Sequence, residues 1–390
     1  MIAAERRTAI LRELRLRGTL TVAEFAGRLG ISPITLRRDL AELESERQLD
    51  RVHGGATLVA PQQAEPAAAP RSARQLAATF GIAPRGTGGP VATIGMIAPT
   101  HGYYYTEIIA GAKEAARLAG VRLVLAISDY NLTEERRMFE RMLALGVDGV
   151  LITPSRSELA DSPLRELIES STVPVTVLER VWEFPTRDRV VDSVRTDHRH
   201  GAEIALAHLT GLGHHHVAGW SFDNPHSAEI RAGFETAAKA AGCQVHRPTF
   251  DYGHEDWDSV DMRSNVRRYL EEAVNEGVTA VLVHPDEFAL QMAQEAAAMG
   301  IGVPEELSII AYDDEVAGLG EIPLTAVAPP KRSLGFVAVD ACLRGIAHAG
   351  PTVEEFPSQR VRLLPVLRVR ESTSPPPAAG TREFRPRDHS

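Results

Sequence analysis

The chain has 390 residues, which corresponds to two or three folded units at the usual domain size. Hydrophobic residues make up 44% and charged residues 24%, as in ordinary soluble globular proteins. No run of about 18 apolar residues is present, which excludes a membrane-spanning helix. The net charge of −10 excludes a protein coated in positive charge. The N-terminus lacks an apolar signal core, so we expect a cytoplasmic protein without a membrane partner.

Composition divides the chain into four parts. Residues 1–59 hold ten arginines against eight acidic residues, so this head suits a local DNA-binding unit on an acidic body. Residues 60–90 are rich in Ala, Pro, Gly and Gln and are predicted to be a linker, with one short helix over 72–80. Residues 91–370 alternate between apolar strands and amphipathic helices. Residues 371–390 are predicted to be a disordered tail.

The head shows the pattern of a helix-turn-helix. A first helix is expected to end near Gly18, and a short second helix spans residues 22–29. Ser32 stands at the position of an N-cap and Pro33 at the first helical position of a third helix. The inward positions of this helix are Ile34, Leu36, Leu40 and Leu43, so its first turns should expose hydroxyls and arginines to the major groove.

A predicted wing follows the third helix, as two short strands around Gly54-Gly55. Together with Arg6-Arg7 and the run from Leu36 to Leu40, this stretch resembles the DeoR-type winged helix. The resemblance implies that the arginine pair and the wing contact DNA, whereas Asp39 is expected to orient an arginine within its own helix. The candidate DNA-binding residues are Ser32, Thr35, Arg37, Arg38, Arg51, His53 and Gly54.

The body is predicted to be α/β, with two βα series in tandem that form two doubly wound parallel sheets. Open sheets of this kind bind ligands beyond the carboxyl ends of their strands, so two facing lobes would enclose a cleft. Segments in order along the chain resemble the LacI/GalR-type ligand domain, which is built like periplasmic sugar-binding proteins. They include residues 94–99, 111–120, 146–155, 212–214, 233–234, 303–314 and 323–325.

The resemblance implies a sugar site of stacked aromatics and hydroxyl-binding charged groups in this cleft. A tyrosine triplet follows the first strand, acidic residues follow several others, and an Asp-Arg pair of the family is matched by Glu-Arg. The candidate ligand-binding residues are Tyr103, Tyr104, Tyr105, Asp129, Glu179, Arg180, Arg231, Asp286 and Asp313.

Three positions depart from the family pattern. Pro285 stands where the family often has Asn, and Pro329 where it often has Gln. The slot of a clamping Arg holds Ile230, with Arg231 about 100° further round the helix. We therefore expect fewer amide and Arg partners than in a typical monosaccharide site.

Neither catalysis nor metal binding is predicted. Adjacent residues of a strand point to opposite faces, so the run His214-His215-His216 should not converge on an ion. Cys243 and Cys342 are expected to be buried thiols, and no cofactor motif is present. The sequence predicts a dimeric transcriptional regulator, more often a repressor, that binds a double-stranded DNA operator under control of a small effector. Two alternatives are a constitutive regulator with a degenerate sensor and a sugar-active enzyme with a tethered head.

Overall fold

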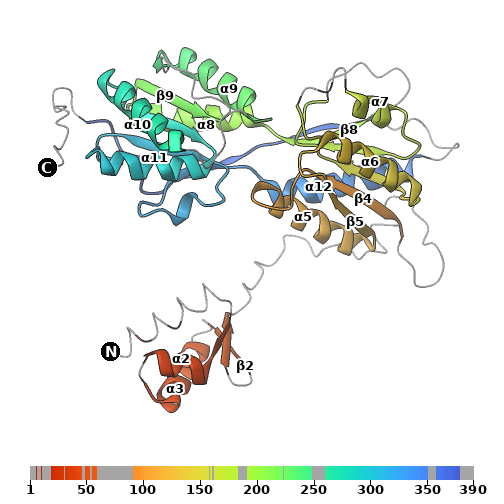
Figure 1. The fold of residues 1–390 in the computed structure, drawn as a ribbon, viewed down its shortest axis with the longest axis horizontal. Coiled ribbons are helices and arrows are strands. Elements are labelled where there is room, and N and C mark those ends of the chain that lie inside the picture. Colours follow the sequence, from red (N-terminus) through yellow and green to blue (C-terminus); the bar gives the residue numbers. More distant parts are fainter. Residues whose placement is uncertain are drawn as a thin grey trace. The chain divides into compact units, whose positions relative to one another are not determined.

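A computed structural model shows two compact units, residues 1–70 and 71–390 (Figure 1). No helix in the described part of the chain is long and apolar enough to cross a membrane. The predicted linker and most of the first helix of the head lie outside the described residues. The structure describes residues 6, 10, 19–29, 31–45, 49–52, 55–58, 91–157, 159, 162–182, 191–222, 224–247, 260–349 and 357–377.

The head contains two helices and a three-stranded antiparallel sheet in its described residues. Its order is β1 (Thr19–Thr21), α2 (Val22–Leu29), α3 (Pro33–Ser45), β2 (Leu49–Val52) and β3 (Gly55–Leu58). β2 and β3 form the predicted wing hairpin, and β1 pairs with β3 to complete the sheet, which the sequence did not predict. Leu36, Leu40 and Leu43 of α3 are buried against Ile10 and Phe25, as their helical spacing requires.

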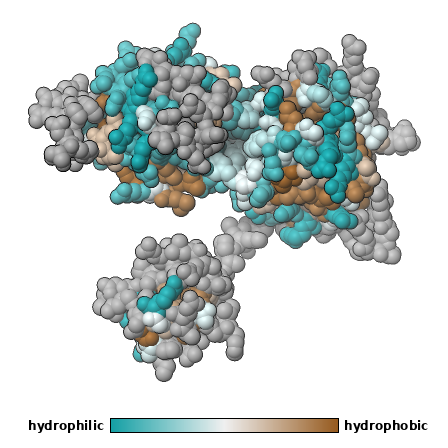
Figure 2. Space-filling model, viewed as in Figure 1, coloured by the Kyte–Doolittle hydropathy of each residue, from teal (hydrophilic) through white to brown (hydrophobic). Residues whose placement is uncertain are grey.

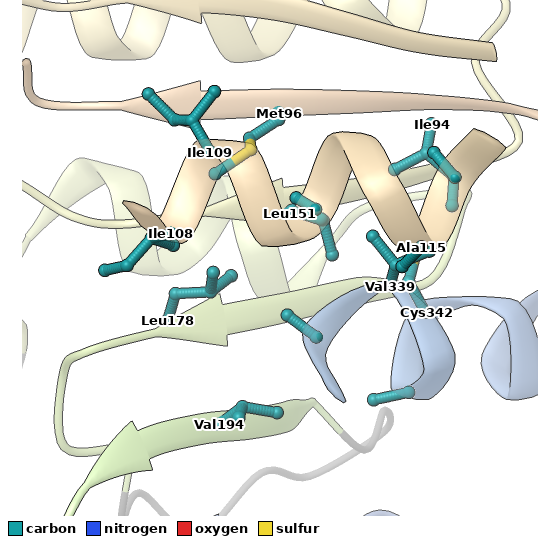
Figure 3. Close-up of a cluster of buried hydrophobic side chains, with 14 of the residues drawn as sticks. Ile94, Met96, Ile108, Ile109, Ala115, Leu151, Leu178, Val194, Val339 and Cys342 are labelled. Carbon is teal, nitrogen blue, oxygen red and sulfur yellow. The ribbon is translucent and has the colours of Figure 1, made fainter. Parts of the chain in front are cut away.

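The N lobe of the body is a mostly parallel sheet in the order β14-β8-β7-β6-β4-β5. Its elements are β4 (Thr93–Ala98), α5 (Tyr104–Ala119), β5 (Arg122–Ile127), α6 (Leu132–Ala144), β6 (Gly149–Ile152), α7 (Pro163–Glu169), β7 (Val175–Leu178), β8 (Asp192–Thr196), α12 (Lys331–Ala347) and β14 (Arg360–Leu363). Figure 3 shows side chains from the central strands, α5 and α12 converging on one core, which includes the buried thiol of Cys342.

The C lobe is a second sheet, in the order β10-β9-β11-β12-β13-β15. Its elements are α8 (His198–Gly211), β9 (His216–Ser221), α9 (Ser227–Ala240), β10 (Gln244–His246), α10 (Val260–Asn275), β11 (Ala280–His284), α11 (Asp286–Ala298), β12 (Ser308–Tyr312), η1 (Ala317–Leu319), β13 (Thr325–Ala328) and β15 (Val366–Arg368). All strand pairs are parallel except β13–β15. β11 and β12 are buried along their whole length, as expected for strands covered by helices on both faces.

The main chain crosses between the lobes three times. The crossings lie between β8 and α8, between β13 and α12, and between β14 and β15. Figure 1 shows the resulting division, with α8 to α11 on one side and α5, α6, α7 and α12 on the other. The two lobes therefore meet at the carboxyl ends of strands of both sheets, the position that open α/β sheets use for ligands.

The predicted start of the disordered tail, residue 371, lies too early in the chain. Residues 371–377 pack on the C lobe, where Ser372 is fully buried and its hydroxyl donates to the Ile309 carbonyl oxygen at 2.5 Å. The Ser374 carbonyl oxygen lies 2.8 Å from Nε2 of His214. Pro-rich composition suggested disorder, but extended chain that satisfies buried polar groups can pack without regular structure.

Backbone contact between α5 and α12 leads to a stability prediction. A Cβ on Gly335 would lie 1.9 Å from the Ile108 carbonyl oxygen, so the helices could not keep their separation. We expect Gly335→Ala to lower the free energy of unfolding by about 1–3 kcal/mol or more, as overpacking does. Gly211→Ala is the control, because a Cβ there meets nothing within 4 Å. Urea unfolding measures both, and equal midpoints would disprove the close approach.

Candidate functional site

The N-terminus of α3 is built as the sequence predicts. The Thr35 backbone N–H donates to Oγ of Ser32 at 3.1 Å, which confirms Ser32 as the N-cap. Ser32 and Arg38 are exposed, and Thr35 is half-buried. The side chains of Arg37 and Arg51, together with all of His53 and Gly54, lie outside the described residues. The part of the DNA-binding surface that can be described is therefore the first two turns of α3.

Asp39 pairs with an arginine from outside its own helix. Its carboxylate, 5% exposed, accepts hydrogen bonds from Nε and Nη2 of Arg6 at 2.7 and 3.0 Å. Asp39 thus orients an arginine that stands 33 positions earlier in the chain, a partner that the sequence did not indicate. Asp39 lies beside Leu40 on the buried side of α3, so it faces the N-terminal segment and ties it to the recognition helix.

In the body, Glu179 stands at the centre of a buried polar cluster between the lobes. It follows β7, and its Oε1 accepts from the Tyr104 hydroxyl at 2.7 Å and from Oγ1 of Thr196 at 2.8 Å. Its Oε2 accepts from the Thr196 backbone N–H at 3.0 Å. Burial acts to raise the pKa of Glu179, but His198 and these donors outweigh it, and the pKa lies below its usual range.

Arg180 and the other two tyrosines extend the cluster. Arg180 is 2% exposed and donates to the Glu179 carbonyl oxygen at 2.7 Å and to the Tyr105 hydroxyl at 3.4 Å. The Tyr104 and Tyr105 rings pack edge to face, 5.6 Å apart. Burial, followed by the charges of Asp313 and Asp286, raises the pKa of Tyr103, so its hydroxyl keeps its proton. The structure thus brings the tyrosine triplet and the Glu-Arg pair together.

The C lobe contributes three histidines and Asp313, which follows β12. Nε2 of His284 lies 3.5 Å from Oδ2 of Asp313, and the Asp313 carbonyl oxygen accepts from Nζ of Lys331. His198 begins α8, and His226 precedes α9, with their rings 4.2 Å apart. The histidines and Lys331 were missed at the sequence level. Their signal was positional, since His198 and His284 each stand at or just after the end of a strand.

Backbone strain marks the same region. Six described residues other than glycine have positive φ angles, and three of them, Tyr103, Glu179 and Asp313, belong to the cluster, with angles of 45°, 52° and 108°. Such conformations cost about 1–3 kcal/mol each and gather at functional sites, where surrounding contacts impose them. The strained residues come from both lobes, so the cluster is defined by geometry as well as by chemistry.

Asp286 has a different role from the predicted one. Its buried carboxylate accepts four backbone N–H groups, from Asp314, Glu315, Val316 and Ala317, at 2.6 to 3.2 Å. Burial and the charge of Asp313 raise the pKa of Asp286 to about 7, although the backbone N–H donors act to lower it. Through these bonds Asp286 positions the loop after Asp313.

Two further candidates lie away from the cluster. Arg231 is exposed on α9 and lines a separate pocket beside β9 and β10, while Ile230 is buried in the C-lobe core. The rotation of one helical position therefore turns the arginine away from the cleft. Asp129 is exposed in the turn after β5, with a φ of 50°. Of the nine predicted ligand residues, Tyr103, Tyr104, Tyr105, Glu179, Arg180 and Asp313 come together.

Comparison with known proteins supports both units. Residues 6–62 match the family described as DeoR-like helix-turn-helix domain, and residues 206–373 match the periplasmic binding protein-like domain. The arabinose metabolism transcriptional repressor of Geobacillus stearothermophilus is 25% identical over 84% of this chain and 84% of its own. The transcriptional regulator DegA of Bacillus subtilis is 28% identical over 74% of this chain and 83% of its own.

Solved structures agree with these matches. A complex of the transcriptional regulator CelR with cellobiose is 26% identical, covers 76% of this chain and 88% of its own, and superposes with a TM-score of 0.61. The lac repressor dimer bound to operator is 21% identical and shows the same fold, with a TM-score of 0.60 over 74% of this chain and 96% of its own. The chain is a DNA-binding transcriptional regulator. Its head matches the DeoR-like helix-turn-helix domain, and its body is similar to LacI-type, periplasmic-binding-protein-like regulators.

The loop contacts of Asp286 lead to a prediction. In Asp286→Asn one carboxylate oxygen becomes an NH₂ group, which cannot accept a backbone N–H. We expect faster amide hydrogen exchange at residues 314–317 and a loss of about 1–3 kcal/mol in stability. Exchange followed by mass spectrometry measures the effect, with the exposed Asp129→Asn as control. Unchanged protection of residues 314–317 would show that Asp286 does not hold the loop.

Proposed function

We propose that this protein is a repressor whose operator binding is controlled by a carbohydrate effector between the two lobes of the body. One observation carries the effector site. Several buried polar atoms of the cluster have no hydrogen-bond partner among the described residues, and they include the Tyr103 hydroxyl, Nε of Arg180 and Oδ1 of Asp313. Buried polar atoms are normally satisfied, so donors and an acceptor left open together suit a ligand whose hydroxyls both donate and accept.

The relatives point in the same direction. One is named for arabinose metabolism, and one solved regulator holds cellobiose. Tyr103, Tyr104 and Tyr105 supply aromatic surface, while Glu179, Arg180 and Asp313 supply charged partners, the combination that sugar sites use. Binding that changes the relation of the lobes needs a differential affinity of about 1–3 kcal/mol to alter DNA binding. In this proposal the protein acts in the cytoplasm and catalyses no reaction.

A homodimer on a two-fold operator completes the proposal. Two-fold proteins read inverted repeats, and one solved relative is a dimer on its operator. The N lobe offers a hydrophobic edge at β5 and α6, where Leu132 and Leu145 are 44% and 62% exposed. Figure 2 shows hydrophobic residues at the surface in the region of β5 and α6. A second copy of the chain is the occupant we propose for this edge.

The head is tested by Arg38→Ala. Loss of a phosphate contact should weaken DNA binding across sequences and reduce the slope of log K against log salt by about 1. Fluorescence anisotropy with a candidate operator at several salt concentrations measures both quantities. Arg247→Ala is the control, since this exposed arginine pairs with Glu235 in the C lobe and belongs neither to the head nor to the proposed dimer edge. Unchanged affinity and slope would remove Arg38 from the DNA-binding surface.

The cleft is tested by thermal unfolding of the full chain with a panel of sugars, starting with arabinose and cellobiose. A sugar that binds the folded state raises the unfolding midpoint. Arg180→Ala should abolish the shift and the effect of that sugar on DNA binding, while DNA binding itself remains. Arg231→Ala should keep the response, because Arg231 faces another pocket. A response that survives Arg180→Ala, or no shift with any sugar, would overturn the effector proposal.

A further inference from the structure

Three potential metal ligands meet inside the cleft. Glu179, His198 and His226 each offer one ligand atom, and these atoms lie within 4.8 Å of one another. The residues are 3%, 1% and 8% exposed, respectively. Glu179 follows β7 in the N lobe, His198 stands at the first crossing, and His226 precedes α9 in the C lobe. The triangle therefore joins the lobes and is not a surface cluster of charges.

Nε2 of His198 is buried and faces Glu179. It lies 3.6 Å from Oε2 of Glu179 and has no hydrogen-bond partner among the described residues. On the other side of the ring, Nδ1 lies 3.2 Å from the Tyr312 hydroxyl oxygen, which donates to the His198 carbonyl oxygen at 3.3 Å. A ring that donates Nδ1–H to this oxygen presents the Nε2 lone pair to Glu179, and a bound cation would bridge the two atoms.

Two of the nearby cations, Arg195 and Lys331, are already paired with carboxylates. Nη1 of Arg195 lies 2.6 Å from both carboxylate oxygens of Glu229, and Lys331 pairs with Glu315. A neutral imidazole and an ionised carboxylate are the forms that bind metals. Tyr312 and Tyr104 would hold His198 and Glu179 in place, as outer-shell groups do at metal sites.

We propose that Glu179, His198 and His226 bind one divalent transition-metal ion of the Zn²⁺ class. Two imidazole nitrogens and one carboxylate oxygen form a donor set that suits Zn²⁺ and neighbouring ions better than Ca²⁺ or Mg²⁺. In this proposal water or effector hydroxyls complete the coordination of the ion. This inference rests on the proposed function only in that it places the ion in the effector cleft. The ion would hold the lobes in the arrangement described here.

Metal titration of the full chain tests the proposal. After chelator treatment and dialysis, the protein is titrated with Zn²⁺ by calorimetry and with Co²⁺ by visible absorption. We expect one cleft ion per chain, with affinity lowered at least tenfold in His226→Gln. Tyr312→Phe keeps all three ligands but removes the partner of His198, and outer-shell losses of this kind lower metal affinity about 10–100-fold.

Matched histidine variants separate the cleft from adventitious binding. His200→Gln changes a more exposed histidine of α8, and His215→Gln changes the exposed member of the histidine run, so both should bind like wild type. His214 needs no variant, because its ring nitrogens lie 2.8 Å from Thr279 and from the Ser374 carbonyl oxygen. Circular dichroism confirms the fold of each variant, and Tyr312→Phe serves if His226→Gln does not fold.

The outcomes distinguish this inference from the proposed function. The metal site is overturned if wild type shows no saturable binding of either ion. It is also overturned if His226→Gln and Tyr312→Phe bind the ions with the affinity of wild type. The same preparations are assayed for DNA binding and for a sugar-induced midpoint shift. Metal binding without a sugar response would remove the carbohydrate effector alone, while a sugar response without metal binding would remove the ion alone.

Discussion

The buried carboxylate of Glu179 is the constraint on which the arrangement of the two lobes depends. A charged group removed from water is tolerated only when hydrogen bonds and opposite charge replace its hydration. Here Tyr104 and Thr196 supply the hydrogen bonds. Thr196 ends β8, two residues before the chain enters α8, so the anchoring of Glu179 also sets the start of the first crossing. Any change at this carboxylate is felt at the connection between the lobes.

Other contacts between the lobes depend on the same region. Arg195, one residue before Thr196, reaches Glu229 on α9, and the Ser157 hydroxyl of the N lobe donates to the Pro225 carbonyl oxygen at 2.9 Å. Lys331, at the second crossing, contacts the loop that Asp286 holds. The crossings and the polar cluster are therefore linked by direct contacts. An effector that changes the cluster would change the relation of the lobes, which is what a regulator needs to transmit binding.

The chain also shows how a site can keep its place while its residues change. Ile230 occupies the slot of a clamping arginine and is buried in the C-lobe core, so that part of the cleft is closed to an arginine. Histidines at residues 198, 226 and 284 line the C-lobe side of the cluster. In the proposals above, these imidazoles extend the chemistry of the site from hydroxyl recognition toward metal coordination.

The sequence by itself determined the elements and the class of protein. Apolar periodicity located the strands and helices of both lobes, Ser32 and Pro33 marked the start of the recognition helix, and ordered local segments indicated the LacI-type body. These features are local, since period, caps and turns are written in neighbouring residues. Positions after strands also indicated that Tyr104, Glu179, Arg180 and Asp313 would lie near one another, and the structure brings them into one cluster, while their part in ligand binding stays a prediction.

Only the tertiary structure decided which side chains meet and what each does. Asp39 and Arg6 pair across 33 positions, and His198 approaches Glu179 from another element. Asp286 has the position of a ligand residue, but the fold of the next loop brings four N–H groups to it. Arg231 stands one helical position after the slot of the clamping arginine, and it lines a different pocket. Such outcomes depend on distances between elements, and hydrogen-bonding partners remote in sequence leave no local pattern from which they can be read.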